Sequence, residues 1–177
     1  GLIPAGLFNK QEGFWGLRYV FPVVLDKHGF GFPSDFGASI TYEVHNMISV
    51  DVAVLNGEGF KTKQMDKSVK GAFGIDIKPT ESIYFRGSYD LIQRNETQST
   101  LAFFAGYNHN DQFRIGVEYG MQSNCMFIPD VNLQALSAFT VFNISDKLGI
   151  FARFDQLSSN TLTGAPAPWN QANNGTT

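Results

Sequence analysis

Alternation of apolar and polar residues runs through most of this chain and constrains its fold more than any other feature. In residues 112–120, Phe113, Ile115, Val117 and Tyr119 alternate with charged residues, glutamine and glycine. Similar runs occupy 35–45, 47–57, 69–78, 82–92, 100–108 and 147–156. Because successive side chains of a β-strand point to opposite faces, each run predicts a strand of about eight to eleven residues. The stretch 131–144 is apolar on both faces, so its orientation stays unassigned.

The connections between these runs follow an order of their own. Short connections are expected at 45–46, 78–81, 108–111 and 145–147, and longer ones at 56–68, 93–98, 121–130 and 157–177. Short and long connections therefore alternate, which puts all the long ones at one end of an antiparallel sheet. Tight turns at one end and long loops at the other are typical of outer-membrane β-barrels. The predicted fold is all-β, an antiparallel transmembrane barrel.

The two faces of the predicted strands differ in charge. One face carries apolar side chains without charges, and aromatic residues such as Tyr42, Tyr89 and Tyr107 recur near its ends. Lipid provides no water to solvate charges, so this face is expected to point outward, and the charged face to line water. A soluble sandwich that binds carbohydrate is the alternative, and its aromatic residues on the polar face would be Tyr84, Phe104 and Phe151.

The composition limits the remaining classes. Charged residues make up 16% of the 177, and the net charge is -3, which argues against a nucleic-acid-binding surface. Lone Cys125 allows no disulfide within the chain. No apolar run reaches the roughly 18 residues that a membrane-spanning helix requires. Nine expected strands, the first at residues 1–8, are an odd number, so we interpret residues 1–177 as a single segment from the centre of a larger barrel.

Three stretches carry a resemblance to a known family. They are GLIPAGLF at 1–8, the RYV of Arg18 to Val20, and NGEGF at 56–60. The chain resembles the phosphate-selective porin O/P-like family of Gram-negative outer membranes over most of residues 1–170. The resemblance implies a barrel of about 16 strands that is often a trimer, so a homo-oligomer, embedded in outer-membrane lipid. It also implies passive diffusion of small hydrophilic solutes.

The resemblance also gives a role to the long connection at 9–34. In such porins a long external loop folds into the lumen and narrows it. Glu12, Trp15 and Arg18 would lie on a short helical turn, with Trp15 and Arg18 on one face. Arg18 is the residue expected to contact a passing anion. Alternatively, Arg18 anchors the loop to a wall carboxylate such as Glu43 or Asp51. Residues 157–177 are expected to form another external loop or a tail.

The pore lining and constriction are predicted from the charged residues of the inner face together with this loop. The predicted residues are Glu12, Trp15, Arg18, Glu43, Asp51, Lys70, Asp76, Arg86, Asp90, Arg114, Glu118, Arg153 and Asp155. The bases on the strands are matched by acids, so their fields cancel and only weak selectivity is expected.

Other functions are weighed against this one. The three histidines, His28, His45 and His109, fall in separate connections, so no catalytic site is expected. No metal-ligand spacing and no cofactor motif is recognised. In a second hypothesis the chain still forms part of a barrel, but the lumen is plugged. The barrel is then a structural or accessory part of a larger envelope complex. The two-faced apolar strand at 132–143 keeps this hypothesis open, because it could pack against another subunit.

Overall fold

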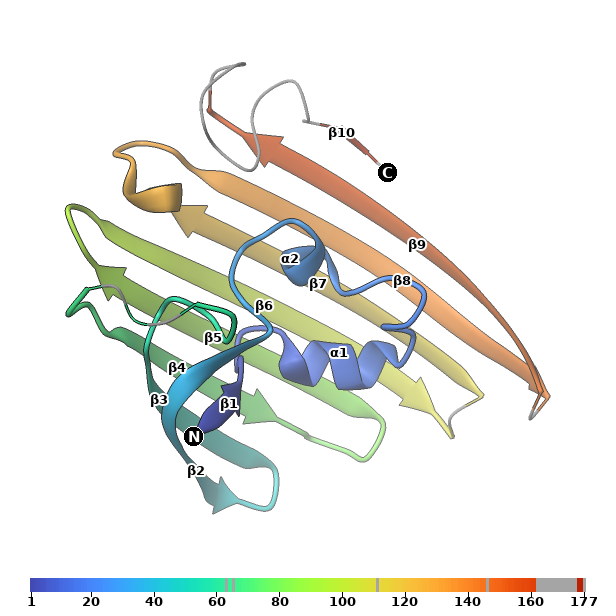
Figure 1. Ribbon diagram of the computed structural model, residues 1–177. Helices are drawn as coiled ribbons and strands as arrows, with labels where there is room; N and C mark the ends of the chain where they lie inside the picture. Colours follow the sequence, from blue (N-terminus) through green and yellow to red (C-terminus); the bar gives the residue numbers. More distant parts are fainter. Residues whose placement is uncertain (63, 65, 111, 146, 162–174, 177) are drawn as a thin grey trace.

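A computed structural model describes residues 1–62, 64, 66–110, 112–145, 147–161 and 175–176. Its strands form one antiparallel sheet in chain order, β1 to β10 (Figure 1). The strands are β1 (Leu2–Pro4), β2 (Ser34–His45), β3 (Ile48–Leu55), β4 (Lys70–Ile77), β5 (Ile83–Gln93), β6 (Thr97–His109), β7 (Phe113–Ser123), β8 (Leu133–Ser145), β9 (Leu148–Ser159) and β10 (Gly175–Thr176). The helices are α1 (Asn9–Trp15), α2 (Val24–Lys27) and the 3-10 helix η1 (Cys125–Phe127). The expected all-β antiparallel architecture is confirmed.

Sequence neighbours pair along the whole sheet, so each hairpin follows from its own local pattern. Across β6 and β7, for example, Phe103 lies opposite Tyr119 and Ala105 opposite Val117. Such aromatic and β-branched cross-strand pairs stabilise a sheet. Beyond residues 34–37 of β2 and 156–157 of β9, the outer edges of these two strands have no pairing partner among the described residues. The sheet is therefore open at both edges.

One strand and one connection differ from the sequence prediction. The first strand covers only Leu2–Pro4, because after Pro4 the chain turns away from the sheet and buries Leu7 and Phe8. The connection predicted as long at 93–98 is a tight turn of residues 94–96, because Gln93 and Thr97 still pair in the ladder. The strict alternation of short and long connections is therefore wrong at the hairpin of β5 and β6. The connections 56–69 and 124–132 are long, as expected.

The sheet has an apolar face that is exposed and a charged face that is partly covered. Ile40 of β2, Phe103 of β6 and Ile150 of β9 are 50–74% exposed on the apolar face. In β8, whose orientation the sequence left open, Leu133 and Phe139 are buried on the charged face, while Phe142 is exposed on the other. Strand β8 therefore carries apolar residues on both faces: one face packs against protein and the other is exposed.

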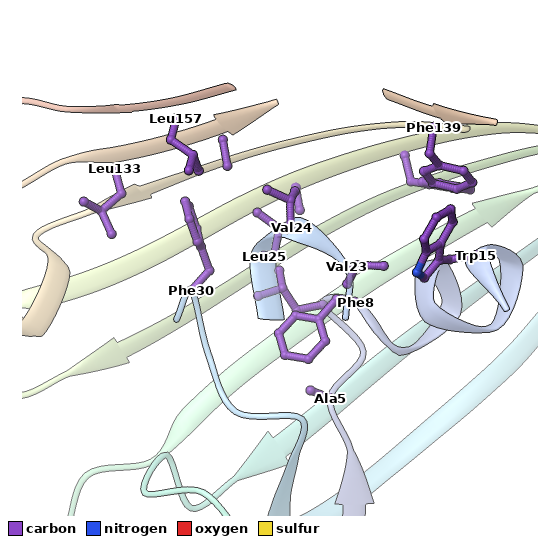
Figure 2. Close-up of a cluster of buried hydrophobic side chains, with 14 of the residues drawn as sticks. Ala5, Phe8, Trp15, Val23, Val24, Leu25, Phe30, Leu133, Phe139 and Leu157 are labelled. Carbon is purple, nitrogen blue, oxygen red and sulfur yellow. The ribbon is translucent and has the colours of Figure 1, made fainter. Parts of the chain in front are cut away.

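Residues 5–33, which we call the inward segment, cover part of the charged face and include α1 and α2 (Figure 1). Figure 2 shows the buried apolar cluster between the segment and the sheet, where Trp15 faces Phe139 and Phe30 lies near Leu157. The ring centroids of Trp15 and Phe139 are 4.7 Å apart in an edge-on arrangement. The core of this chain therefore lies between one connection and one face of the sheet. Among the described residues, none of the helices has the length and apolarity to cross a membrane.

Glycines let the inward segment approach the sheet closely. A Cβ atom on Gly106 of β6 would lie 2.6 Å from Phe14, and one on Gly120 of β7 would lie 2.3 Å from Leu25. Real Cβ atoms do not come so near other atoms, so any larger residue at these two positions would push the segment away.

Candidate functional site

Helix α1 places the first of the predicted constriction residues. It ends at Trp15, because Gly16 adopts a left-handed conformation (φ 71°) and its N–H donates to the carbonyl of Glu12. The predicted helical turn through Arg18 is therefore wrong. Trp15 is buried at 1% exposure, and its indole N–H donates to the Phe21 carbonyl at 2.8 Å. Trp15 thus connects two parts of the inward segment, α1 and Phe21, and packs against the sheet.

Arg18 binds carboxylates of its own segment. Its guanidinium lies 2.8 Å from Glu12 Oε1 and 2.6 Å from Asp26 Oδ2, and its side chain is half exposed. Partial burial alone would lower the pKa of Arg18, but the two carboxylates outweigh it and raise that pKa. Neither Glu43 nor Asp51, the expected wall partners, contacts it: Asp51 binds Arg86 instead. Arg18 therefore fixes the chain path between α1 and α2.

Arg86 of β5 joins the sheet to the start of the inward segment. Its Nη1 lies 2.9 Å from Asp51 Oδ2 and 2.8 Å from Asp76 Oδ1, and Tyr84 also donates to Asp76. Its Nε and Nη2 donate to the Gly6 carbonyl at 3.0 and 2.8 Å. The Arg86 side chain is 1% exposed, so these partners replace its hydration.

Three further side chains of the sheet repeat this contact with backbone carbonyls. Arg114 of β7 donates to Phe14, Arg153 of β9 to Pro22, and Gln122 of β7 to Phe30, at 3.2, 2.6 and 2.8 Å. Together with Gly6, the accepting carbonyls recur every eight residues along the inward segment. We call these four contacts the carbonyl clamp, made by Arg86, Arg114, Arg153 and Gln122. The clamp holds the segment through its backbone and leaves its side chains for packing.

The other predicted residues form pairs or stay apart. Lys70 lies 2.8 Å from Asp90, and Arg153 lies 2.7 Å from Asp155. Glu118 is 1% exposed and accepts a hydrogen bond from the backbone N–H of Val24. Glu43 is exposed near the end of β2 and forms no ion pair with any described residue.

The structure thus brings twelve of the thirteen predicted residues to one region, and only Glu43 lies outside it. Five charged side chains of the sheet are at most 3% exposed and contact other side chains of the sheet or the inward segment: Asp76, Arg86, Asp90, Glu118 and Asp155. Pore lining by these thirteen residues stays a prediction.

Sequence reasoning missed three residues of this region. Lys10 of α1 lies 3.8 Å from Asp76, Asp26 of α2 pairs with Arg18, and Gln122 belongs to the carbonyl clamp. Gln122 does lie on the charged side of the alternating pattern, which was the available signal. Lys10 and Asp26 depend on how the inward segment folds back, and no periodic pattern reports that.

The described residues include no group of three or more His, Cys, Asp and Glu side chains placed to hold a metal ion. His28 follows α2, whereas His45 and His109 end β2 and β6, so the histidines remain apart. A comparison of the chain with family models, with curated proteins and with solved structures finds no match.

Proposed function

We propose that this chain forms part of an outer-membrane β-barrel through which small hydrophilic solutes diffuse with weak selectivity. The observation that carries the proposal is the exposed apolar face, which continues from β2 to β9. Phe73, Phe103, Val117 and Phe154 on four of these strands are 43–50% exposed. Soluble monomers rarely expose an apolar surface of this extent, whereas a barrel in lipid requires one.

Charge compensation on the other face supports weak selectivity. Arg86 lies between Asp51 and Asp76, and Lys70 is paired with Asp90. Paired charges leave no row of free cations or anions that would favour one sign of ion. The resemblance to phosphate-selective porins therefore supports a diffusion channel better than a phosphate channel.

The environment and assembly belong to the same proposal. The apolar face contacts outer-membrane lipid, and the unpaired edges of β2 and β9 are closed by further strands or by other copies of the chain. Closure removes the unpaired backbone groups, which lipid cannot solvate. A homo-oligomer, as a trimer, and a barrel of about 16 strands follow from the family resemblance. The proposal includes no catalytic step, no cofactor, no metal and no nucleic acid.

One observation favours a second candidate, an accessory barrel with an occluded lumen. The inward segment covers part of the charged face, and the carbonyl clamp fixes it there at four places. A segment held this firmly can close the lumen as well as narrow it.

Conductance distinguishes the two candidates. The chain would be reconstituted into planar lipid bilayers at concentrations that allow copies to associate, and the current recorded in potassium chloride. The channel proposal expects discrete steps and a cation-to-anion permeability ratio near one. Stable insertion without steps would favour the accessory barrel, and failure to insert under any folding condition would contradict both.

A further inference from the structure

A pocket of about 430 Å³ lies between the inward segment and the connections at one end of the sheet. Phe30 and Phe32 line it from the inward segment, Ile92 and Arg94 from the end of β5, and Phe127 from η1. Its volume lies within the range of sites that hold small molecules, roughly 300–1,000 Å³. Passive diffusion requires no such pocket, so its function goes beyond the proposed channel.

The polar side chains of this pocket are mainly hydrogen-bond donors. Arg94 carries five N–H groups. Its Nη2 donates to Glu58 and its Nε lies 3.0 Å from Asp66, whereas its Nη1 has no partner among the described residues. The ammonium group of Lys70 contacts Asp90, and its remaining N–H groups are available to a ligand. The side-chain oxygen of Gln98 accepts from the Met126 N–H. The Gln98 amide nitrogen has no protein partner in the part of the chain that the structure describes.

A strained connection forms one wall of the pocket. Asn124, Met126, Phe127 and Asp130 all have φ between 52° and 62°, a region that costs most residues other than glycine of order 1–3 kcal/mol each. The Asn124 side chain donates to the Thr97 carbonyl at 2.9 Å and accepts from the Asp130 N–H at 3.0 Å. These contacts hold the Phe127 ring 4.5 Å from the Arg94 guanidinium. The wall is therefore formed before any ligand arrives.

We propose that this pocket binds a small amphipathic anion, a carboxylate attached to an aromatic or branched apolar body. The carboxylate binds the free donors of Arg94, Lys70 and Gln98, because an oxyanion offers only acceptors. The apolar body packs between Phe30, Phe32 and Phe127. Glu58 is the acidic residue among those that line the pocket, and it already binds Arg94, so a cationic ligand gains fewer partners there than an anion does.

The test measures binding to the full chain in detergent micelles by saturation-transfer NMR. Phenylacetate carries both parts of the proposed ligand, phenylacetamide has the same shape without the charge, and acetate has the charge without the ring. We expect saturable binding of phenylacetate, with phenylacetamide and acetate at least tenfold weaker. Binding of phenylacetate that does not saturate with concentration, or equal affinity for phenylacetamide, would overturn the proposal.

Matched variants locate the site. Gln98→Glu keeps the oxygen that accepts from Met126 but replaces the donor by a negative charge, so phenylacetate affinity should fall at least tenfold. Phe32→Ala should weaken the binding of phenylacetate and leave the binding of acetate unchanged. Lys78→Gln, which removes an exposed cation near Tyr84 outside the pocket, should leave both unchanged. Circular dichroism verifies the folding of each variant, and unchanged affinity in folded Gln98→Glu would contradict the assignment. Binding is measured without a conducting bilayer, so its result does not depend on whether the channel proposal holds.

Discussion

Arg86 illustrates how a single side chain decides whether the inward segment stays on the sheet. It is buried, it faces two carboxylates, and it donates to the Gly6 carbonyl from 80 positions away in sequence. Removing one member of a buried ion pair leaves an uncompensated charge, which costs far more than the pair itself contributes. At Arg86 the loss would leave both Asp51 and Asp76 without their guanidinium.

The first prediction compares this buried arginine with a half-exposed one. Arg86→Met should lower the free energy of unfolding by about 3–5 kcal/mol. Arg18→Met is the matched control, because its ion pairs are partly in solvent, and it should cost about 1 kcal/mol or less. Urea unfolding followed by circular dichroism measures both. Equal losses in the two variants would contradict the role assigned to Arg86.

The second prediction concerns the thiol of Cys125 in η1, the chain's one cysteine. Burial raises the pKa of Cys125 to about 11, from an ordinary value of 9.0. Since the thiolate is the reactive form, the folded chain at pH 8 should react with N-ethylmaleimide about 100-fold more slowly than the urea-unfolded chain. The rate should rise with pH up to the folded pKa. A folded chain that reacts as fast as the unfolded one would show that Cys125 is not buried.

At the scale of elements, the inward segment depends on positions in the sheet that lack a side chain. Gly106 leaves room for the Phe14 ring, which also contacts Phe104 edge-on at 5.2 Å between centroids. Helix α1 has only seven residues, too few to be stable alone, so its packing against the sheet must supply its stability.

The third prediction tests this contact. Gly106→Leu should force Phe14 away and lower the free energy of unfolding by about 1–3 kcal/mol, as overpacking does in a dense core. Gly71→Ala in β4 is the control, because a Cβ there meets no atom within 4 Å, and its effect should stay within about 0.5 kcal/mol. Denaturant unfolding of both variants makes the comparison. A neutral Gly106→Leu would place Phe14 elsewhere.

The same elements show what the sequence could and could not predict. Alternation placed β2 to β9 correctly, because a period of two is a local property that neighbouring strands preserve. It could not place α1, which ends at Trp15 because Gly16 adopts a left-handed conformation, a feature that no periodic pattern reports. It also could not pair Arg18 with Asp26, or Arg86 with Gly6, because such contacts arise only when the segment folds back over the sheet. The orientation of β8 was unpredictable for a related reason, since its covered face is apolar like its exposed one.

At the scale of the whole molecule, the two faces of the sheet need different surroundings. The inward segment covers part of the charged face (Figure 1), whereas the apolar side chains of the other face are exposed from β2 to β9. Burying so broad an apolar face is strongly favourable, so its natural environment is lipid or another protein. The proposed lipid environment would account for its continuity over eight strands.

The fourth prediction places a charge on this face. Val117 lies near the middle of β7 and is 43% exposed. In lipid vesicles Val117→Arg should lower the free energy of unfolding by about 2–4 kcal/mol, the cost of an arginine at the bilayer midplane. Thr62→Arg, an exposed residue of the connection 56–69, should be close to neutral. If Val117→Arg is also neutral, the apolar face does not contact lipid.

The most direct test of lipid contact is the collision accessibility of a nitroxide spin label at Val117. The label would replace Val117 through cysteine in a Cys125→Ser background, in the chain reconstituted into bilayers, with a label at Thr62 as the aqueous reference. Oxygen concentrates in the bilayer and a charged nickel chelate stays in water, so their ratio reports the surroundings of the label. A membrane barrel predicts that oxygen relaxes the Val117 label more strongly than nickel does, with the reverse at Thr62. A Val117 label that nickel reaches as readily as the one at Thr62 would contradict the membrane barrel.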